Sequence, residues 1–404
     1  MPEQRPITVL CLASDFKGVP FIEEINRLDA RILLLVKEDA ARKAWPYDKI
    51  DGFFQMPDLY TQPDITYAVS YLARSHKIDR VVALDDYDVA TAASLREHLR
   101  LPGMNESTAR HFRDKLAMRV KARESGIKVP DFSAVFNYDD LRNFMGHVAA
   151  PWVLKPRFEA GARGIRKLHD AEEVWRALEE LGDQQSYYLL EQFLPGDVYH
   201  VDSIIWQGEP LFALVSKYGA PPLSITQGGG IFNTRTLARD SDESQGLVES
   251  NKIILRALGH EQGIAHTEFI RSSADNQFYF LETAARVGGA NIDRMVKAAS
   301  GIELWAEAAR IELADIRGES YQIPSHRQDS AGLIICLAQQ EYPDLSKYNE
   351  LEIVWRLDKP YHAGLLIASG EAQRVETLLN EYNGRFARDF LHHLPGAKEV
   401  RTTI

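Results

Sequence analysis

The sequence predicts a mixed α/β and α+β protein of more than one domain, and three observations support this. Short apolar runs alternate with helix-like segments from residue 7 to about 100, which is typical of parallel βαβ units. Later in the chain, two apolar runs flank a short polar turn, which is typical of an antiparallel β-hairpin. At 404 residues, the chain is also too long for a single ordinary core.

The first part of the chain is expected to form a small parallel sheet. Apolar runs at 7–12, 31–36 and 80–84 are strand candidates, and 21–28 is a helix candidate between the first two. The dinucleotide fingerprint G-x-G-x-x-G is missing after the first run, so we expect no dinucleotide site. The third run is followed by three aspartates, which either line a cleft at the strand end or form a solvated helix N-terminus: Asp85, Asp86 and Asp88.

Bulk composition excludes several classes of protein. The net charge of -11 and the pI near 5.6 argue against a general binder of nucleic acid or membrane surfaces. No secretory signal pattern is found at the start, and the longest aliphatic run, 32–36, is too short to span a bilayer. Cys11 and Cys336 lie in apolar text and are expected to be buried thiols. We therefore expect a cytoplasmic protein.

The predicted hairpin carries two glutamates, Glu268 and Glu282, and Arg286 follows it. Because the apolar runs flank the polar turn 272–276, a hairpin brings both carboxylates to the same end of one sheet. Paired hard oxygen ligands beside an arginine suit Mg²⁺ that carries nucleotide phosphates. The sequence therefore predicts that the protein works on ATP. His266 shares a strand face with Glu268 and is interpreted as its hydrogen-bond partner rather than as a metal ligand.

A lysine and a glycine-bearing loop form a second motif. Lys155 lies at the end of an apolar run, and the loop 158–165 follows it. The lysine would present a charge at a cleft, and the loop would offer backbone N–H groups to a phosphate. The alternative is a hairpin loop with a surface lysine.

An extended run at 187–196 ends in a Pro-Gly turn and suits an adenine hinge. Backbone groups and the Glu191 carboxylate would bond the exocyclic amine, while Phe193 and leucines sandwich the ring. The alternative is an ordinary strand exit.

One long helix is predicted before these motifs. Asn105 is its expected N-cap, the helix runs to about Glu124, and Gly126 is the C-cap. Lys115 lies on this helix and, taken alone, is a solvated lysine, so a role for it depends on the other motifs.

Glycines also interrupt the region between the hinge and the hairpin. The triple glycine 228–230 can let a ligand approach the backbone, and Arg235 can bind a substrate carboxylate. The alternative is a flexible surface loop.

The order of these motifs resembles the ATP-grasp superfamily. The lysine helix comes first, then Lys155 with its glycine loop, the hinge, and the two glutamates with Arg286. The resemblance implies an ATP-grasp domain at 105–315. It also implies a Rossmann-like pre-ATP-grasp domain at 1–104 and a C-terminal α+β region at 316–404 that packs on the ATP-grasp domain.

The resemblance also implies roles for single residues. Glu268 and Glu282 match the Mg²⁺ ligands, with Mn²⁺ as the alternative metal, and Arg286 and Lys155 match catalytic residues. Gly288 and Gly289, which follow Arg286 after one valine, are expected to bind substrate, together with Arg235. The ATP-binding residues implied in this way are Lys115, Lys155, Gly161, Arg163, Gly164, Glu191, Gln192, Phe193 and Leu194.

The sequence departs from the family pattern at two places. The frequent Glu-x-Asn-x-Arg reads Glu-Thr-Ala-Ala-Arg here, so Ala284 replaces a metal-liganding asparagine and the metal is held more loosely or by water. The usual ribose carboxylate falls on Val198, and Asp197 or His200 is the substitute that we expect.

The resemblance implies a ligase that uses ATP and Mg²⁺ to activate a carboxylate as an acyl phosphate for attack by an amine, as amino-acid ligases do. Two alternatives stay open: a carboxylase of the biotin or purine type, and a nucleotide-binding regulatory protein without catalysis. The expected partners are a small-molecule carboxylate and an amine, without nucleic acid or membrane. A homodimer is common in such families. The sequence does not name the acid or the amine.

Overall fold

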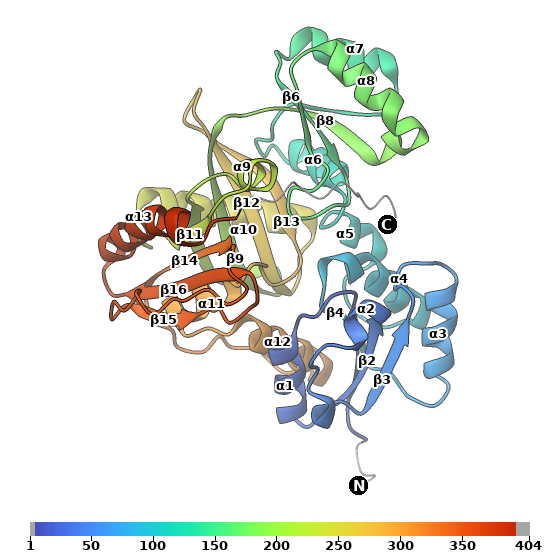
Figure 1. Cartoon of the computed structure of the whole chain (residues 1–404). Helices are drawn as coiled ribbons and strands as arrows, with labels where there is room; N and C mark the ends of the chain where they lie inside the picture. The colour runs from blue at the N-terminus through green and yellow to red at the C-terminus, as the bar shows by residue number, and fades with distance from the viewer. Residues whose placement is uncertain (1–4, 393–404) are drawn as a thin grey trace.

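Three β-sheets organise the protein. The computed structural model describes residues 5–392. Figure 1 shows the N-terminal sheet (blue) and a small sheet with β6 and β8 (green) on opposite sides of a central hairpin, β12 and β13. This hairpin belongs to a large sheet, which continues toward β15 and α13.

The N-terminal sheet is parallel throughout, as predicted. Its strand order is β3-β2-β1-β4. Alternate residues of β1 pack in two different apolar cores: Val9 and Cys11 lie in one core, and Leu10 and Leu12 lie in the other. Burial on both faces explains why its strands read as continuous apolar runs. The strands are β1 (Thr8–Ala13), β2 (Arg31–Lys37), β3 (Gly52–Met56) and β4 (Arg80–Ala83). The helices are α1 (Val19–Arg27), α2 (Glu38–Ala41), α3 (Asp64–Leu72) and α4 (Val89–Leu99), with 3₁₀ turns η1 (Tyr47–Lys49) and η2 (Asp86–Asp88).

The prediction of one long helix after residue 105 is wrong, because two helices stand there. Asn105 caps α5 (Glu106–Arg110), its side chain accepting from the N–H of Thr108. The chain then turns, and the Asp114 carboxylate caps α6 (Lys115–Glu124). A second N-cap satisfies the free N–H groups of a new helix start, so the first helix does not need to continue.

The small sheet has the order β5-β8-β6-β7, and its paired strands are antiparallel. The chain runs here as strand, helix, strand, turn, helix and strand, with β7 as an additional three-residue strand after the glycine loop. The elements are β5 (Phe132–Ala134), α7 (Tyr138–His147), β6 (Trp152–Pro156), β7 (Arg166–Leu168), α8 (Ala171–Leu181), η3 (Gly182–Tyr187) and β8 (Tyr188–Gln192).

The large sheet has eight strands in the order β13-β12-β9-β10-β11-β14-β16-β15. Because β14 pairs with β11, the C-terminal strands continue the sheet that contains the hairpin. The strands are β9 (Gly196–Trp206), β10 (Glu209–Tyr218), β11 (Phe232–Thr236), β12 (Gly263–Ser272), β13 (Phe278–Ala284), β14 (Ser330–Leu337), β15 (Ile353–Arg356) and β16 (His362–Ser369). The helices are α9 (Pro222–Gly228), α10 (Asp242–Leu258), α11 (Ile292–Ser300), α12 (Leu304–Arg317) and α13 (Ala372–Asp389).

Helix α12 joins the large sheet to the N-terminal unit. Leu304 and Ile311 pack in the core of the large sheet, whereas Ala309 and Leu313 pack in the core that contains β1 and α1. The predicted boundary at 315 therefore falls inside a helix that both units share. The three-part division stays a prediction, and residues 393–404 of its third part lie outside the described residues.

Two other expectations concern the molecule as a whole. Cys11 and Cys336 are buried and free, as predicted. Between residues 5 and 392, no helix has the length and apolar character that crossing a membrane requires.

Candidate active site

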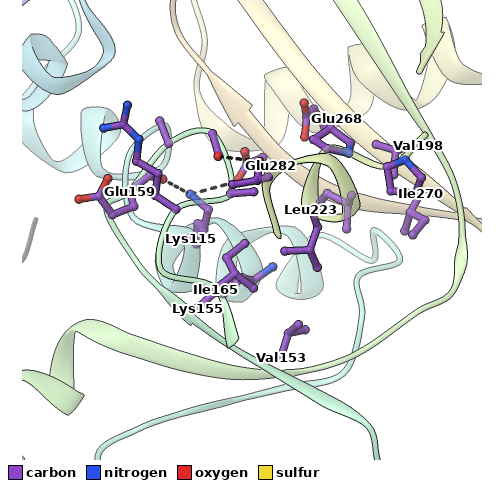
Figure 2. Close-up of a pocket in the computed structure, with 18 of the residues that line it drawn as sticks. Lys115, Val153, Lys155, Glu159, Ile165, Val198, Leu223, Glu268, Ile270 and Glu282 are labelled. Carbon is purple, nitrogen blue, oxygen red and sulfur yellow. Dashed lines mark hydrogen bonds and ion pairs between the residues drawn. The ribbon is translucent and has the colours of Figure 1, made fainter. Parts of the chain in front are cut away.

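Glu268 and Glu282 lie opposite each other in the hairpin β12–β13. They are register partners, and a bulge follows between Glu268 and Phe269. Directly opposed residues project from the same face of a sheet. Both carboxylates therefore enter one cavity, in which Figure 2 shows them with Lys115 and Lys155. The hairpin is found as predicted, and both glutamates lie at the same end of one sheet, while the metal role of the pair stays a prediction.

The cavity has a volume of about 480 Å³, within the usual range for small-molecule and cofactor sites. Its walls come from the small sheet, the hinge after β8, the large sheet and the η2 turn of the N-terminal unit. Apolar lining residues include Met118, Val153, Phe193, Leu194, Ile270 and Leu281. Charged lining residues include Asp86, Arg113, Lys115, Lys155, Arg163, Glu191, Glu268, Glu282 and Arg286.

Lys115 is the first residue of α6 and reaches the hairpin. Its Nζ donates to the backbone oxygen of Glu159 at 2.5 Å and lies 3.0 Å from Oε2 of Glu282. Only 8% of the residue is exposed, so the solvated alternative is wrong. Burial opposes ionisation of Glu282, but the charges of Lys115 and Lys155 outweigh it and lower the pKa of Glu282.

Lys155 on β6 pairs with Glu191 on β8. Its Nζ donates to one oxygen of Glu191, and Nε of Arg119 donates to the other at 2.6 Å. Burial lowers the pKa of Lys155 to about 8, although Glu191 acts in the opposite direction. Burial also opposes ionisation of Glu191, yet Arg119 and Lys155 lower its pKa. Lys155 is buried, so the surface-lysine alternative is wrong.

The hinge therefore differs from the prediction in one respect. Because both carboxylate oxygens of Glu191 already hold cations, the carboxylate is not the group that faces an adenine amine. Gln192, Phe193 and Leu194 line the cavity directly after it. The hinge backbone is thus the remaining candidate for adenine recognition. Arg119 was missed, because an arginine in the middle of a helix gives no signal in the sequence.

The glycine loop lies over the same cavity. Gly161 and Gly164 have φ of 69° and 68°, a left-handed conformation that favours glycine. Gly161 and Arg163 line the cavity, whereas Gly164 is not among its lining residues. The loop approaches α9, where Oγ1 of Thr226 lies 3.5 Å from the backbone oxygen of Gly161.

Arg286 is held by the N-terminal unit. Its Nε lies 3.2 Å from Oδ1 of Asp86, and Arg113 donates to the other oxygen of the same carboxylate. Burial opposes the charge of Arg286, but Asp86 and Asp85 raise its pKa. Asp85, Asp86 and Asp88 are all buried, so they are not a solvated helix end, and Asp86 lines the cavity as the other interpretation expected.

Neither of the expected ribose partners faces the cavity. Asp197 is exposed and its carboxylate pairs with Lys217 at 2.6 Å. His200 is fully buried, and its ring nitrogens bond Asp202 and Thr234 at 2.8 Å each. The structure does not bring either side chain into the cavity, since both have partners elsewhere, and the ribose role stays a prediction. Val198 itself lines the cavity.

The substrate residues expected between hinge and hairpin also need correction. Arg235 does not line the cavity, because its guanidinium pairs with Glu376 of α13 at 2.6 Å. Of the two glycines, Gly289 lines the cavity, whereas Gly288 packs against Asp202 and His266.

Residues 221–226 line the cavity through the short helix α9, which neither interpretation of this region predicted. Leu223 and Ile225 add apolar surface there, and Figure 2 shows Leu223 among the side chains that line the cavity. The adjacent glycines hide this helix in the sequence, because they break its pattern after only two turns.

A cluster of His200, Asp202 and His266 lies beside Glu268, and His266 also lines the cavity. The two Nδ1 atoms lie 2.8 and 2.9 Å from the two oxygens of Asp202. Burial opposes ionisation of Asp202, but the charges of His266 and His200 outweigh it and lower the pKa of Asp202. Burial also lowers the pKa of His266, but Asp202 outweighs it and raises this pKa to about 9. The carboxylate is used by both histidines, so the cluster is a structural support. The predicted hydrogen-bond role of His266 is consistent with this placement.

Comparison with known proteins identifies the fold. No family model matches the chain. The sequence is 27% identical over 262 residues to the L-arginine-specific L-amino acid ligase of Bacillus subtilis, covering 62% of this chain. The match also spans 62% of that relative, which is less than two thirds of its length.

Two solved structures superpose over nearly the whole chain. The L-amino acid ligase of Bacillus licheniformis has a TM-score of 0.75 at 20% identity, covering 98% of this chain and 100% of that chain. The ADP complex of N5-carboxyaminoimidazole synthetase from Staphylococcus aureus has a TM-score of 0.71 at 15% identity, covering 94% and 97%.

These likenesses identify the fold. The protein has the ATP-grasp fold, with a small parallel α/β unit at its N-terminal side, as the order of motifs predicted. By sequence, it is similar to the L-arginine-specific L-amino acid ligase of Bacillus subtilis.

Proposed function

We propose that the protein is a ligase that uses ATP to join a carboxylate to an amine, of the amino-acid ligase type. One observation carries the proposal: Glu268 and Glu282 share a cavity with Lys115, Lys155 and Arg286. Such a set of carboxylates and cations suits a divalent metal and a phosphate chain. Similarity to a named amino acid ligase supports the reaction type.

The donor chemistry fits Mg²⁺ and a nucleotide. Glu268 and Glu282 would hold the metal, with Mn²⁺ as the alternative, and Lys115 and Lys155 would hold the phosphates. Ala284 adds no oxygen ligand, which suits Mg²⁺ because this ion keeps several waters. When bound, the metal supplies charge neutralisation at the phosphoryl oxygens. The apolar hinge side of the cavity would hold the base.

In the proposed reaction the carboxylate takes a phosphoryl group and becomes an acyl phosphate, and the amine then displaces phosphate as the C–N bond forms. Lys155 and Arg286 both line the cavity, and their charges would stabilise the transferring oxygens. Asp86, which pairs with Arg286, would orient it for this task. The glycine loop and α9 would exclude water, which otherwise hydrolyses an acyl phosphate.

A screen of amino-acid pairs for phosphate release, with ATP and Mg²⁺, tests the proposal. We expect release only when both an acid and an amine are present, with one ligated product for each phosphate. Glu282→Ala should abolish this turnover, because it removes a metal ligand. The control is Glu172→Ala, since Glu172 is exposed on α8 and pairs with Arg176. Full activity of Glu282→Ala would contradict the metal assignment.

The same screen separates the alternatives. A carboxylase of the biotin or purine type would release phosphate with bicarbonate and not with amino acids. A regulatory protein would bind ATP without forming ADP for any pair. The expected homodimer and the cytoplasmic setting belong to this proposal as well, and mass measurement in solution tests the first of them.

A further inference from the structure

A buried hydrogen-bond network of Tyr218, His266, Asp202, His200 and Thr234 contacts Glu268. It extends over four neighbouring strands, β12, β9, β10 and β11, whose register places its members on one face of the sheet. His266 lies opposite Asp202 in this register, Glu268 lies opposite His200, and Tyr218 lies opposite Thr234. Sequence alternation had connected only His266 and Glu268, because the other members come from distant strands.

One oxygen of Glu268 receives two contacts from this network. The Tyr218 hydroxyl donates to Oε1 at 2.8 Å, and Nε2 of His266 lies 3.6 Å from the same atom. Nδ1 of His266 lies 2.9 Å from Asp202, and a carboxylate only accepts, so this nitrogen is the donor. The ring of His266 is thereby fixed with Nε2 toward Glu268. Oxygen Oε2 of Glu268 receives neither contact.

The two groups that contact Oε1 have little freedom. The Tyr218 ring is 5% exposed and packs against the rings of His200 and Phe232, with centroids 4.7 and 5.7 Å away. His200 is locked in turn by Asp202 and Thr234. Gly288 packs directly against the network, because a Cβ at this position would lie 2.8 Å from Oδ1 of Asp202. Any side chain there would displace the carboxylate.

We infer that Tyr218, with the Asp202–His266 pair, is a positioning residue that fixes Oε1 of Glu268 and leaves Oε2 to bind the divalent metal. The inference rests on the proposed function, because it concerns the same metal site. Partners behind a metal ligand orient it, and their loss typically weakens metal affinity about 10- to 100-fold. Tyr218 acts only through Glu268 in this scheme and needs no contact with the metal.

The test is a Mn²⁺ titration, followed by electron paramagnetic resonance, of the full chain with saturating ADP. We expect Tyr218→Phe, which keeps the ring packing, to weaken Mn²⁺ binding about 10- to 100-fold. The melting temperature without metal should change little. Tyr199→Phe is the matched control. Tyr199 is also buried on β9, but its hydroxyl donates to Glu243 at 2.7 Å, on the other face of the strand.

Each outcome decides a different point. If Tyr218→Phe binds Mn²⁺ as tightly as the wild type, the inference is overturned while the proposed function stands. Equal weakening in Tyr199→Phe would attribute the effect to general loosening of the sheet and would also overturn it. A wild-type protein that binds no Mn²⁺ with ADP would instead contradict the proposed function. His266→Asn gives a second variant and should weaken Mn²⁺ binding in the same direction.

Discussion

At the scale of single residues, the site depends on charges buried beside opposite charges. Lys155 is the clearest case, because burial lowers its pKa to about 8 while Glu191 keeps the ammonium paired. Arg119 pairs with the same carboxylate, so Glu191 keeps one cationic partner when Lys155 is neutral. A buried lysine of this kind can change its charge near neutral pH, which an arginine cannot.

Nucleotide affinity should therefore fall as the pH rises above 8. Lys155 is cationic below its pKa and neutral above it, so each further pH unit lowers the protonated fraction about tenfold and weakens phosphate binding. Calorimetric titration with ADP between pH 7 and 9 measures this. Lys155→Arg, which stays charged, is the control and should give a flatter profile. Parallel profiles for the two proteins would exclude the phosphate role of Lys155.

Sequence reasoning found those site residues whose signal is local. Glu268 and Glu282 stand in one alternating pattern around one turn, and Lys155 ends a strand before a glycine loop, so neighbouring residues reveal them. Arg119 was missed because its partner Glu191 lies 72 positions away in the chain. Asp202 was given no role because it joins His200 to His266, which lies 64 positions away. Such contacts depend on strand order and helix packing, which no local pattern encodes.

At the scale of elements, the break between α5 and α6 determines where Lys115 lies. Asp114 caps α6 at the N–H of Leu116, and its carboxylate also pairs with Arg157 after β6. Lys115 consequently starts the helix and points toward the hairpin rather than to solvent. A single carboxylate thus couples the start of α6 to the loop that follows Lys155.

Replacing Asp114 with alanine should lower both stability and nucleotide affinity. Loss of an N-cap costs about 1 kcal/mol, and Arg157 also loses its partner. Thermal unfolding and ADP titration measure the two effects. Asp170→Ala removes the cap of α8, where the side chain accepts from Glu173, and lies away from the cavity. This control should lose stability but keep ADP affinity; a similar loss of affinity would show that α6 has no special role.

The elements that were predicted wrongly are short or are interrupted by polar caps. The β12–β13 hairpin and the strands β1, β2 and β4 follow from clear periodicity. β7 has only three residues, and α9 ends in glycines, so neither has enough length for a period to show. The pattern of α5 and α6 reads as one helix because four residues are too few to disturb it.

At the scale of the whole molecule, the N-terminal unit completes the site. Asp86, just after β4, holds both Arg286 beyond the hairpin and Arg113 before α6. Helix α12 packs on the same unit and on the large sheet. The parallel sheet was predictable from its apolar runs. The contact between this unit and the cavity was not predictable, because it joins Asp86 to Arg286, which lie far apart in the sequence.

Under the proposed function, Asp86→Asn should lower kcat about tenfold or more, while the KM for ATP changes little. The amide keeps the shape of the side chain but loses the charge that orients Arg286, and a small misplacement at a reacting centre has large effects on rate. Steady-state kinetics separate the two constants. Asp79→Asn is the control, since Asp79 pairs with Arg5 away from the cavity. An unchanged kcat would remove Asp86 from the scheme.

The pairing of β11 with β14 has a consequence for protein engineering. An exchange of C-terminal segments between relatives, cut at residue 315, would replace the strand that pairs with the outer edge of β11, and a strand in another register would leave backbone groups of β11 unpaired. Unprotected strand edges recruit other chains and promote aggregation. A workable chimera therefore carries β14, β16 and β15 together with the hairpin, or brings a replacement strand that continues the ladder of β11 in the same register.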